Sequence, residues 1–168
     1  MLNNLYFPEN TLTKVLNNYD PKLLVPIESL LEQDKVVSTC TNPTRSENGK
    51  DIVYQHDLLF INKIAKLNNN GENNKTPFYK LTYSVNSGKT QDMIVPGFVK
   101  FYSRTSRSYC SLNFLRKTDV LVDYQLYDVK ILNIEECEKP ESAFIYKLTV
   151  SSSVDWISFY YNGILGTI

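Results

Sequence analysis

The side chains that could perform covalent chemistry are few and widely spaced along this chain. It contains a single histidine, His56, and three cysteines at Cys40, Cys110 and Cys137. Nucleophilic triads of the Ser-His-Asp or Cys-His kind would have to converge on that one histidine. No cysteine lies near it in sequence, and no serine stands in a G-x-S-x-G motif. We therefore interpret His56 as a surface or strand residue and predict no catalytic residue.

Metal and phosphate sites are also not indicated. The histidine and the three cysteines show no C-x-x-C or H-x-x-x-H spacing, so we predict no structural zinc. The segment NSGKT, residues 86–90, resembles the end of a phosphate-binding loop but lacks the upstream glycine and the following helix. It fits a tight hairpin better. We predict that the chain has neither a metal nor a cofactor.

Carboxylates recur at Asp119, Asp123 and Asp128, and then as four glutamates that flank a proline turn: Glu135, Glu136, Glu138 and Glu141. On an extended strand Asp119 and Asp123 share one face while Asp128 lies on the other. That is a poor arrangement for a paired general acid and base. The sequence therefore predicts a protein that is not an enzyme.

Residues 100–117 contain five basic side chains and no acidic one, interleaved with aromatic residues. Cations and aromatic faces on a sheet suit single-stranded nucleic acid. The favoured alternative places the aromatic residues inward and the cations in turns, because the 18 basic and 18 acidic residues of the whole chain cancel. A third alternative is contact with an acidic patch on another subunit. The candidates for nucleic-acid contact are Lys100, Tyr102, Arg104, Arg107, Tyr109, Arg116 and Lys117.

Length and composition favour one cytoplasmic β-rich domain. A chain of 168 residues with 12 Tyr and 8 Phe can bury its own core, and an odd number of cysteines favours free thiols. The N-terminus lacks the basic and apolar regions of a signal peptide, and no apolar run is long enough to span a bilayer. We expect cytoplasmic synthesis and no membrane partner.

The first 34 residues are predicted to form a short helical arm. Asn10 or Thr11 can cap a helix that ends near Asn18, and a second helix fits residues 26–33. From residue 35 to residue 168 the apolar period changes to two, which predicts a separate antiparallel β domain. We found no internal repeat in the sequence.

Seven or eight strands joined by short polar turns predict a mainly β fold, either an antiparallel β-barrel or a β-sandwich. Residues 86–89 and the pair Asn162-Gly163 are hairpin signals, and Pro96-Gly97 should interrupt a strand. Residues 52–67 fit a helix or a strand, and we favour a strand. Residues 120–137 are predicted to be the longest extended run.

Because the sequence shows no catalytic motif, we predict a function that depends on protein-protein contacts. We predict a non-enzymatic structural or connector subunit of a large homo- or hetero-oligomeric assembly, such as a viral or phage particle, acting through protein-protein contacts and incorporated into a virion. The alternative is an OB-like barrel in a complex that binds single-stranded nucleic acid. The candidate interface anchors are Leu23, Leu24, Ile27, Leu30, Trp156, Phe159, Tyr160, Ile164 and Ile168.

Overall fold

The computed structural model confirms a mainly antiparallel β fold. It describes residues 2–8, 12–14, 24–39, 44–45, 51–52, 56–68, 77–138, 144–151 and 159–167. Among these residues no helix is long and apolar enough to cross a lipid bilayer.

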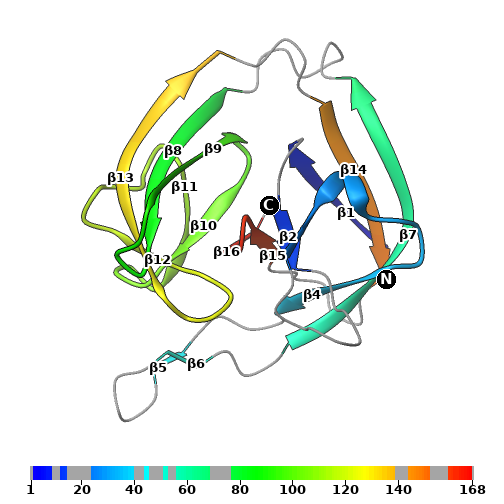
Figure 1. The fold of residues 1–168 in the computed structure, drawn as a ribbon, viewed down its shortest axis with the longest axis horizontal. Coiled ribbons are helices and arrows are strands. Elements are labelled where there is room, and N and C mark those ends of the chain that lie inside the picture. Colours follow the sequence, from blue (N-terminus) through cyan, green and yellow to red (C-terminus); the bar gives the residue numbers. More distant parts are fainter. Residues whose placement is uncertain are drawn as a thin grey trace.

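One sheet has four strands in the order β1-β14-β7-β4, and every neighbouring pair is antiparallel. It forms one curved wall of the molecule (Figure 1). Its strands are β1 (Leu2–Pro8), β4 (Lys35–Thr39), β7 (His56–Asn68) and β14 (Phe144–Ser151).

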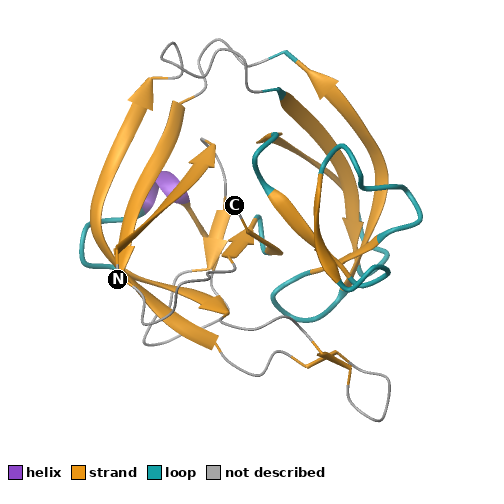
Figure 2. Cartoon of the chain, turned by 180° about the vertical axis from the view of Figure 1, so that it is seen from behind, coloured by secondary structure: helices purple, strands orange, loops and turns teal. Residues whose placement is uncertain are grey.

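The second sheet has eight strands in the order β15-β16-β10-β12-β13-β8-β9, with β11 paired to β10. Figure 1 and the reverse view in Figure 2 both place β15 and β16 between the two curved walls. The strands are β8 (Phe78–Val85), β9 (Thr90–Pro96), β10 (Lys100–Ser103), β11 (Ser108–Ser111), β12 (Val120–Val122), β13 (Asp128–Cys137), β15 (Phe159–Tyr161) and β16 (Ile164–Thr167). Two small ribbons are β2 (Leu12–Lys14) with β3 (Leu24–Pro26) and β5 (Thr44–Arg45) with β6 (Asp51–Ile52).

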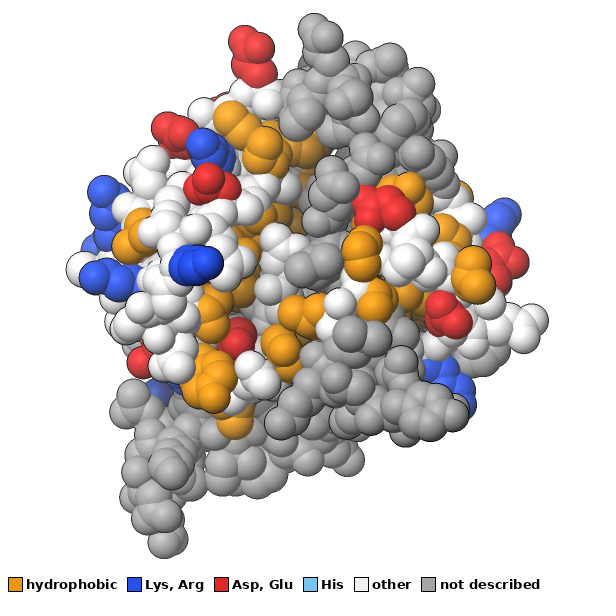
Figure 3. Space-filling view, in the orientation of Figure 1, with side chains coloured by type: hydrophobic (Ala, Val, Ile, Leu, Met, Phe, Trp, Pro, Cys, Tyr) orange, Lys and Arg blue, Asp and Glu red, His pale blue; other side chains and the backbone are white. Residues whose placement is uncertain are grey.

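The main hydrophobic core is shared by the two large sheets. Leu148 and Val150 of β14 belong to the same buried cluster as Leu81 of β8 and Ile131 of β13. On the face seen in Figure 3, hydrophobic side chains gather toward the middle, and acidic and basic side chains interleave on the outer rim. Burial of apolar area between the sheets therefore holds the two walls together.

The predicted hairpins are confirmed. Asn86 and Ser87 have φ of 51° and 58° between β8 and β9, and Asn162 and Gly163 have φ of 50° and 82° between β15 and β16. Positive φ at both central residues is the geometry of a two-residue type I′ turn. The long strand β7 confirms the strand interpretation for most of residues 52–67.

The predicted N-terminal helical arm is wrong wherever the structure describes it. Residues 12–14, inside the first predicted helix, form β2, which pairs with β3. Residues 2–8 form β1, which pairs with β14 along its whole length, and residues 27–29 form a single 3-10 turn, η1 (Ile27–Ser29). Pairing with a long central strand outweighs the weak helix preference of a few residues. The proposed helix cap at residues 10–11 and the helix end near residue 18 lie outside the described residues.

The run at 120–137 is not one strand but two, β12 and β13, separated by a tight loop at residues 123–127. The carboxylate of Asp123 turns the chain, because its Oδ1 accepts hydrogen bonds from the backbone N–H groups of Gln125 (3.0 Å) and Tyr127 (2.8 Å). Leu126 adopts a φ of 67° at the bend. Aspartate is favoured at turns for this ability to bond to nearby backbone groups.

A short structural repeat precedes β4 and β12, which corrects the finding of no repeat. Asp34 Oδ2 accepts from the backbone N–H of Leu31 at 2.9 Å, and Asp119 Oδ2 accepts from the backbone N–H of Arg116 at 2.8 Å. The N–H groups of the two aspartates donate back to the same two residues at 3.1 and 2.9 Å. Buried residues occupy equivalent positions around each aspartate: Ile27 and Leu112, Leu30 and Leu115, and Val36 and Leu121.

Replacing either aspartate of this repeat by alanine is expected to lower the free energy of unfolding by about 1–3 kcal/mol, because a backbone N–H loses its acceptor. The loss should be larger for Asp119→Ala, since Asp119 Oδ1 also accepts from the buried hydroxyl of Ser103 at 3.0 Å. Urea unfolding at neutral pH measures both. The exposed residue Glu135 provides a control, Glu135→Ala, and equal stability of all three variants would contradict the assigned roles.

Candidate functional site around the terminal hairpin

The terminal hairpin, residues 159–167, occupies the centre of the molecule. Its strand β16 pairs with β15 on one side and with β10 on the other, and β15 also contacts β2 and β4. All four residues of β16 are buried. The hairpin therefore connects the eight-stranded sheet to strands from the N-terminal part of the chain, which explains why so apolar a segment can occur there.

Two glycines allow this close fit. A Cβ at Gly166 would lie 2.7 Å from the carbonyl oxygen of Lys100, closer than packing permits. Gly163 has a φ of 82°, and a Cβ there would lie 3.0 Å from the ring of Tyr124. Glycine is the residue for which both a positive φ and a near backbone carry little cost.

Two consecutive residues of β15 face different hydrophobic clusters. The fully buried Tyr161 packs in the main core, with its ring edge-on to Phe101 at a centroid distance of 6.1 Å. Tyr160 points into a smaller cluster with Tyr102, Val122 and Leu165, and it meets Tyr124 edge-on at 6.5 Å. Successive residues of a strand point to opposite faces, so β15 contributes one tyrosine to each of the two hydrophobic clusters.

Asp123 is a buried carboxyl group beside the hairpin. Its backbone forms an antiparallel bridge with Ile164, and the residue as a whole is only 6% exposed. Burial raises the pKa of this carboxyl, against the opposing effects of the Tyr127 and Gln125 N–H groups and of the Arg104 charge. An aspartate in such a site retains its proton to higher pH than an ordinary one.

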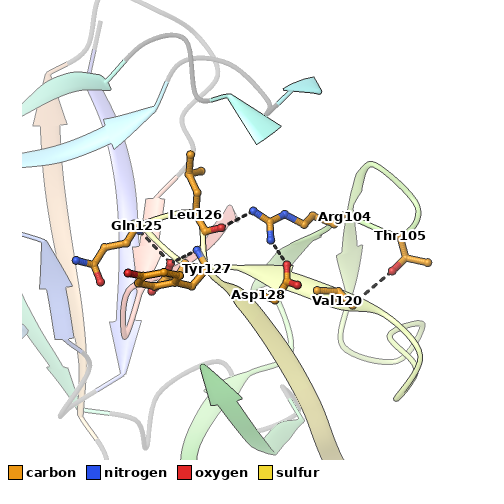
Figure 4. Close-up of polar contacts among 8 residues, drawn as sticks. Arg104, Thr105, Val120, Gln125, Leu126, Tyr127 and Asp128 are labelled. Atoms are coloured by element: carbon orange, nitrogen blue, oxygen red, sulfur yellow. Dashed lines mark hydrogen bonds and ion pairs between the residues drawn. The ribbon is translucent and has the colours of Figure 1, made fainter. Parts of the chain in front are cut away.

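Arg104 braces the loop that Asp123 begins. It forms an ion pair with Asp128, and its Nη2 donates to the carbonyl oxygen of Leu126 at 2.6 Å. Figure 4 shows the guanidinium reaching toward the loop between these two acceptors. The guanidinium of Arg104 thus binds two acceptors of its own chain.

The hydroxyl group of Tyr160 is buried, and among the described residues it has no hydrogen-bond partner. Burial, and secondarily the charge of Asp123, raises the pKa of Tyr160, so the phenol stays protonated. A buried hydroxyl that makes no hydrogen bond keeps its full desolvation cost.

Removing this hydroxyl with Tyr160→Phe is expected to raise the free energy of unfolding by about 1 kcal/mol, because the ring packing is kept and the desolvation cost is relieved. Chemical denaturation measures the change. The control is Tyr127→Phe at an exposed position, which should leave stability within about 0.5 kcal/mol. A loss of stability in Tyr160→Phe would show that the hydroxyl is satisfied.

The residues predicted to contact nucleic acid do not form one aromatic and basic surface. Tyr102 is 3% exposed and packs edge-on against the half-buried Tyr109 at 5.3 Å. With Arg104 in an ion pair, the aromatic faces and this guanidinium are directed into the chain. The remaining cations are exposed: Lys100, Arg107, Arg116 and Lys117.

The predicted interface anchors that the structure describes mainly fill the chain's own interior. Ile27, Leu30, Tyr160 and Ile164 are buried, and Leu24 is half-buried. Phe159 belongs to β15, but its side chain is not described. Leu23, Trp156 and Ile168 lie outside the described residues.

The described nucleophiles are scattered. Cys110 and Cys137 are free, half-buried thiols, whereas Cys40 lies outside the described residues. Burial raises the pKa of Cys137, which disfavours its thiolate. No group of three potential metal ligands occurs within the described part of the chain. His56 begins β7 opposite Thr39 of β4, the strand that contacts β15.

No protein-family model and no curated protein sequence matches this chain. Solved structures do match it, along nearly its whole length. A bacterial intein-like domain from Clostridium thermocellum has a TM-score of 0.61 at 16% identity, covering 97% of this chain and 98% of that one. An intein from a hyperthermophile has a TM-score of 0.61 at 17% identity, covering 99% and 100%. The gp41-1 intein has a TM-score of 0.53 at 19% identity, covering 99% of both chains.

These likenesses overturn three predictions made from the sequence. The structural subunit of a virion or other assembly, the OB-like nucleic-acid binder and the non-enzymatic character were all wrong, because inteins are protein-splicing domains. The error arose because the fold, rather than any local motif, carries the signal. From β1 to β16, the chain has the fold of inteins.

Proposed function

We propose that this chain is an intein-type self-processing domain, which breaks two peptide bonds of the polypeptide that contains it, one on each side, and joins the flanking segments through one new peptide bond. The observation that carries this proposal is the match over whole chains: 97% or more of this chain corresponds to 98% or more of an intein-like domain and of an intein.

The chemistry of this function is acyl transfer. A hydroxyl, a thiol or water attacks the carbonyl carbon of a peptide bond, the C–N bond breaks, and the leaving nitrogen takes up a proton. A side chain that can exchange protons near neutral pH accelerates such a step.

His56 is the residue that we assign to proton transfer, because it is the only imidazole in the chain. Its strand β7 pairs with β4, and β4 contacts β15 of the terminal hairpin. The path from His56 to the hairpin therefore crosses a single strand. Asp123, in contrast, has a structural role that its two backbone hydrogen bonds explain.

The proposal is tested by placing the 168-residue chain between two well-folded reporter proteins and purifying the fusion. We expect spontaneous cleavage of the fusion, with fragment masses that match hydrolysis or excision. The control is the same fusion with His56→Ala. A wild-type fusion that stays intact through days of incubation, while the inserted chain is folded, would contradict self-processing.

A further inference from the structure

The loop at residues 123–127, called here the Asp123 loop, is a closed unit with its own hydrogen bonds. The N–H of Asp123 donates to the carbonyl oxygen of Tyr127 at 3.1 Å, and the N–H of Leu126 donates to the carbonyl oxygen of Asp123 at 2.9 Å. The Asp123 carboxylate accepts from Gln125 and Tyr127 as described above. One side chain therefore sets the shape of the whole loop.

This loop forms backbone contacts with the turn of the terminal hairpin. The N–H of Tyr124 donates to the carbonyl oxygen of Gly163 at 2.8 Å, next to the bridge between Asp123 and Ile164. The ring of Tyr124 lies edge-on to Tyr160 and against the backbone of Gly163. The contacts reach both strands of the hairpin and the turn between them.

The rest of the sheet holds β16 by a short ladder. Along β10, only Lys100 and Phe101 pair with β16, after which Ser103 pairs with Leu121 of β12. The Asp123 loop begins where β12 ends and continues the contact with β16 at Ile164. A two-stranded hairpin is marginally stable by itself, so its order depends on such docking.

The loop can open at lower cost than the sheet around it. Gln125 and Tyr127 are exposed, and Leu126 holds a φ of 67°, a conformation that is unfavourable for a residue with a side chain. Segments with exposed backbone bonds and few buried side chains open before the core does.

We propose that the Asp123 loop is a latch, and that its closure determines whether the terminal hairpin is docked between the two sheets. With the latch open, β15 and β16 separate from β10 as a unit and expose Ile164 and Leu165. The charged and titratable groups that face the latch are Arg104 and Asp128 on one side and Tyr160 on the other. This inference does not depend on self-processing.

Hydrogen exchange of the isolated 168-residue chain tests the latch. In Asp123→Ala the loop N–H groups lose their acceptor, and we expect the amides of β15 and β16 to exchange roughly tenfold faster or more, while those of β8 and β13 change by less than about twofold. Asp123→Asn keeps an oxygen acceptor and should stay within about threefold of wild type. The matched control is Glu135→Ala on the exposed face of β13.

Acceleration of all protected amides by the same factor in Asp123→Ala would overturn the proposal, because it would show that the hairpin opens only with the whole protein. Should Asp123→Ala fail to fold, Tyr124→Leu removes the ring contact with Tyr160 and keeps the backbone bonds. It should also accelerate exchange in the hairpin selectively, and uniform exchange in this variant would equally overturn the latch. Cleavage of a reporter fusion is measured separately from hydrogen exchange. Failure of the latch proposal can therefore be distinguished from failure of the self-processing proposal.

Discussion

Replacing His56 by alanine is expected to slow self-processing of the reporter fusion roughly 10²- to 10⁴-fold, the contribution that a positioned general acid or base makes to proton transfer. The reason is that no second imidazole exists in the chain to take over. The rate is measured as the loss of intact fusion with time on gels, with fragment masses confirming the cleavage sites.

A matched variant separates chemistry from folding in this experiment. His56→Gln keeps a polar side chain of similar length but cannot exchange protons near neutral pH, so it should be as slow as His56→Ala. Thermal unfolding of both isolated variants should resemble that of the wild type. Processing of His56→Ala at the wild-type rate would remove His56 from the mechanism.

The second large effect is expected at Gly166, where alanine should lower the free energy of unfolding by about 3 kcal/mol, at the upper end of the usual cost of overpacking. The added Cβ would lie 2.7 Å from the carbonyl oxygen of Lys100, a backbone atom that cannot turn away as a side chain could. Because this is the point where β16 pairs with β10, the hairpin must shift or undock.

Urea unfolding measures the effect of Gly166→Ala, and Lys130→Ala, at an exposed position on β13, is the control that should change stability by less than about 0.5 kcal/mol. In fusions, Gly166→Ala should also reduce processing, since the hairpin is displaced. A stability close to that of the wild type would mean that β16 is not held as tightly against β10 as the structure places it.

Local chemistry explains the parts of the fold that the sequence predicted well. Asn162-Gly163 and Asn86-Ser87 form hairpins because positive φ is a property of these residues themselves. The strand period at the start of β13 was visible for the same reason, since the buried Val129 and Ile131 alternate with exposed residues. Such features require no knowledge of distant contacts.

Features that depend on distant partners were missed. Residues 2–8 form a strand because β14, more than 130 positions away in sequence, pairs with them. The loop that begins at Asp123 interrupts an apparently continuous strand because its carboxylate bonds to two backbone groups, which a strand-period argument does not consider. The repeat at Asp34 and Asp119 escaped notice because it preserves the aspartate and the apolar spacing rather than the sequence.

The likeness to inteins was missed for a related reason. A single histidine and three separated cysteines gave no motif in the sequence, so the chain was interpreted as non-enzymatic. Only the assembled fold brings β7, β4 and the terminal hairpin into one neighbourhood. Contacts between strands that lie far apart in the chain cannot be inferred from sequence spacing, and the sequence contained no other sign of them.

The most direct measurement is the intact mass of the products released from a fusion that carries the chain between two reporters. The account predicts a species whose mass equals the two reporters joined by a peptide bond, together with the excised chain, and predicts that both form roughly 10²- to 10⁴-fold more slowly with His56→Ala. A folded wild-type insert that yields neither this joined product nor any fragment cut at its borders would contradict the central claim.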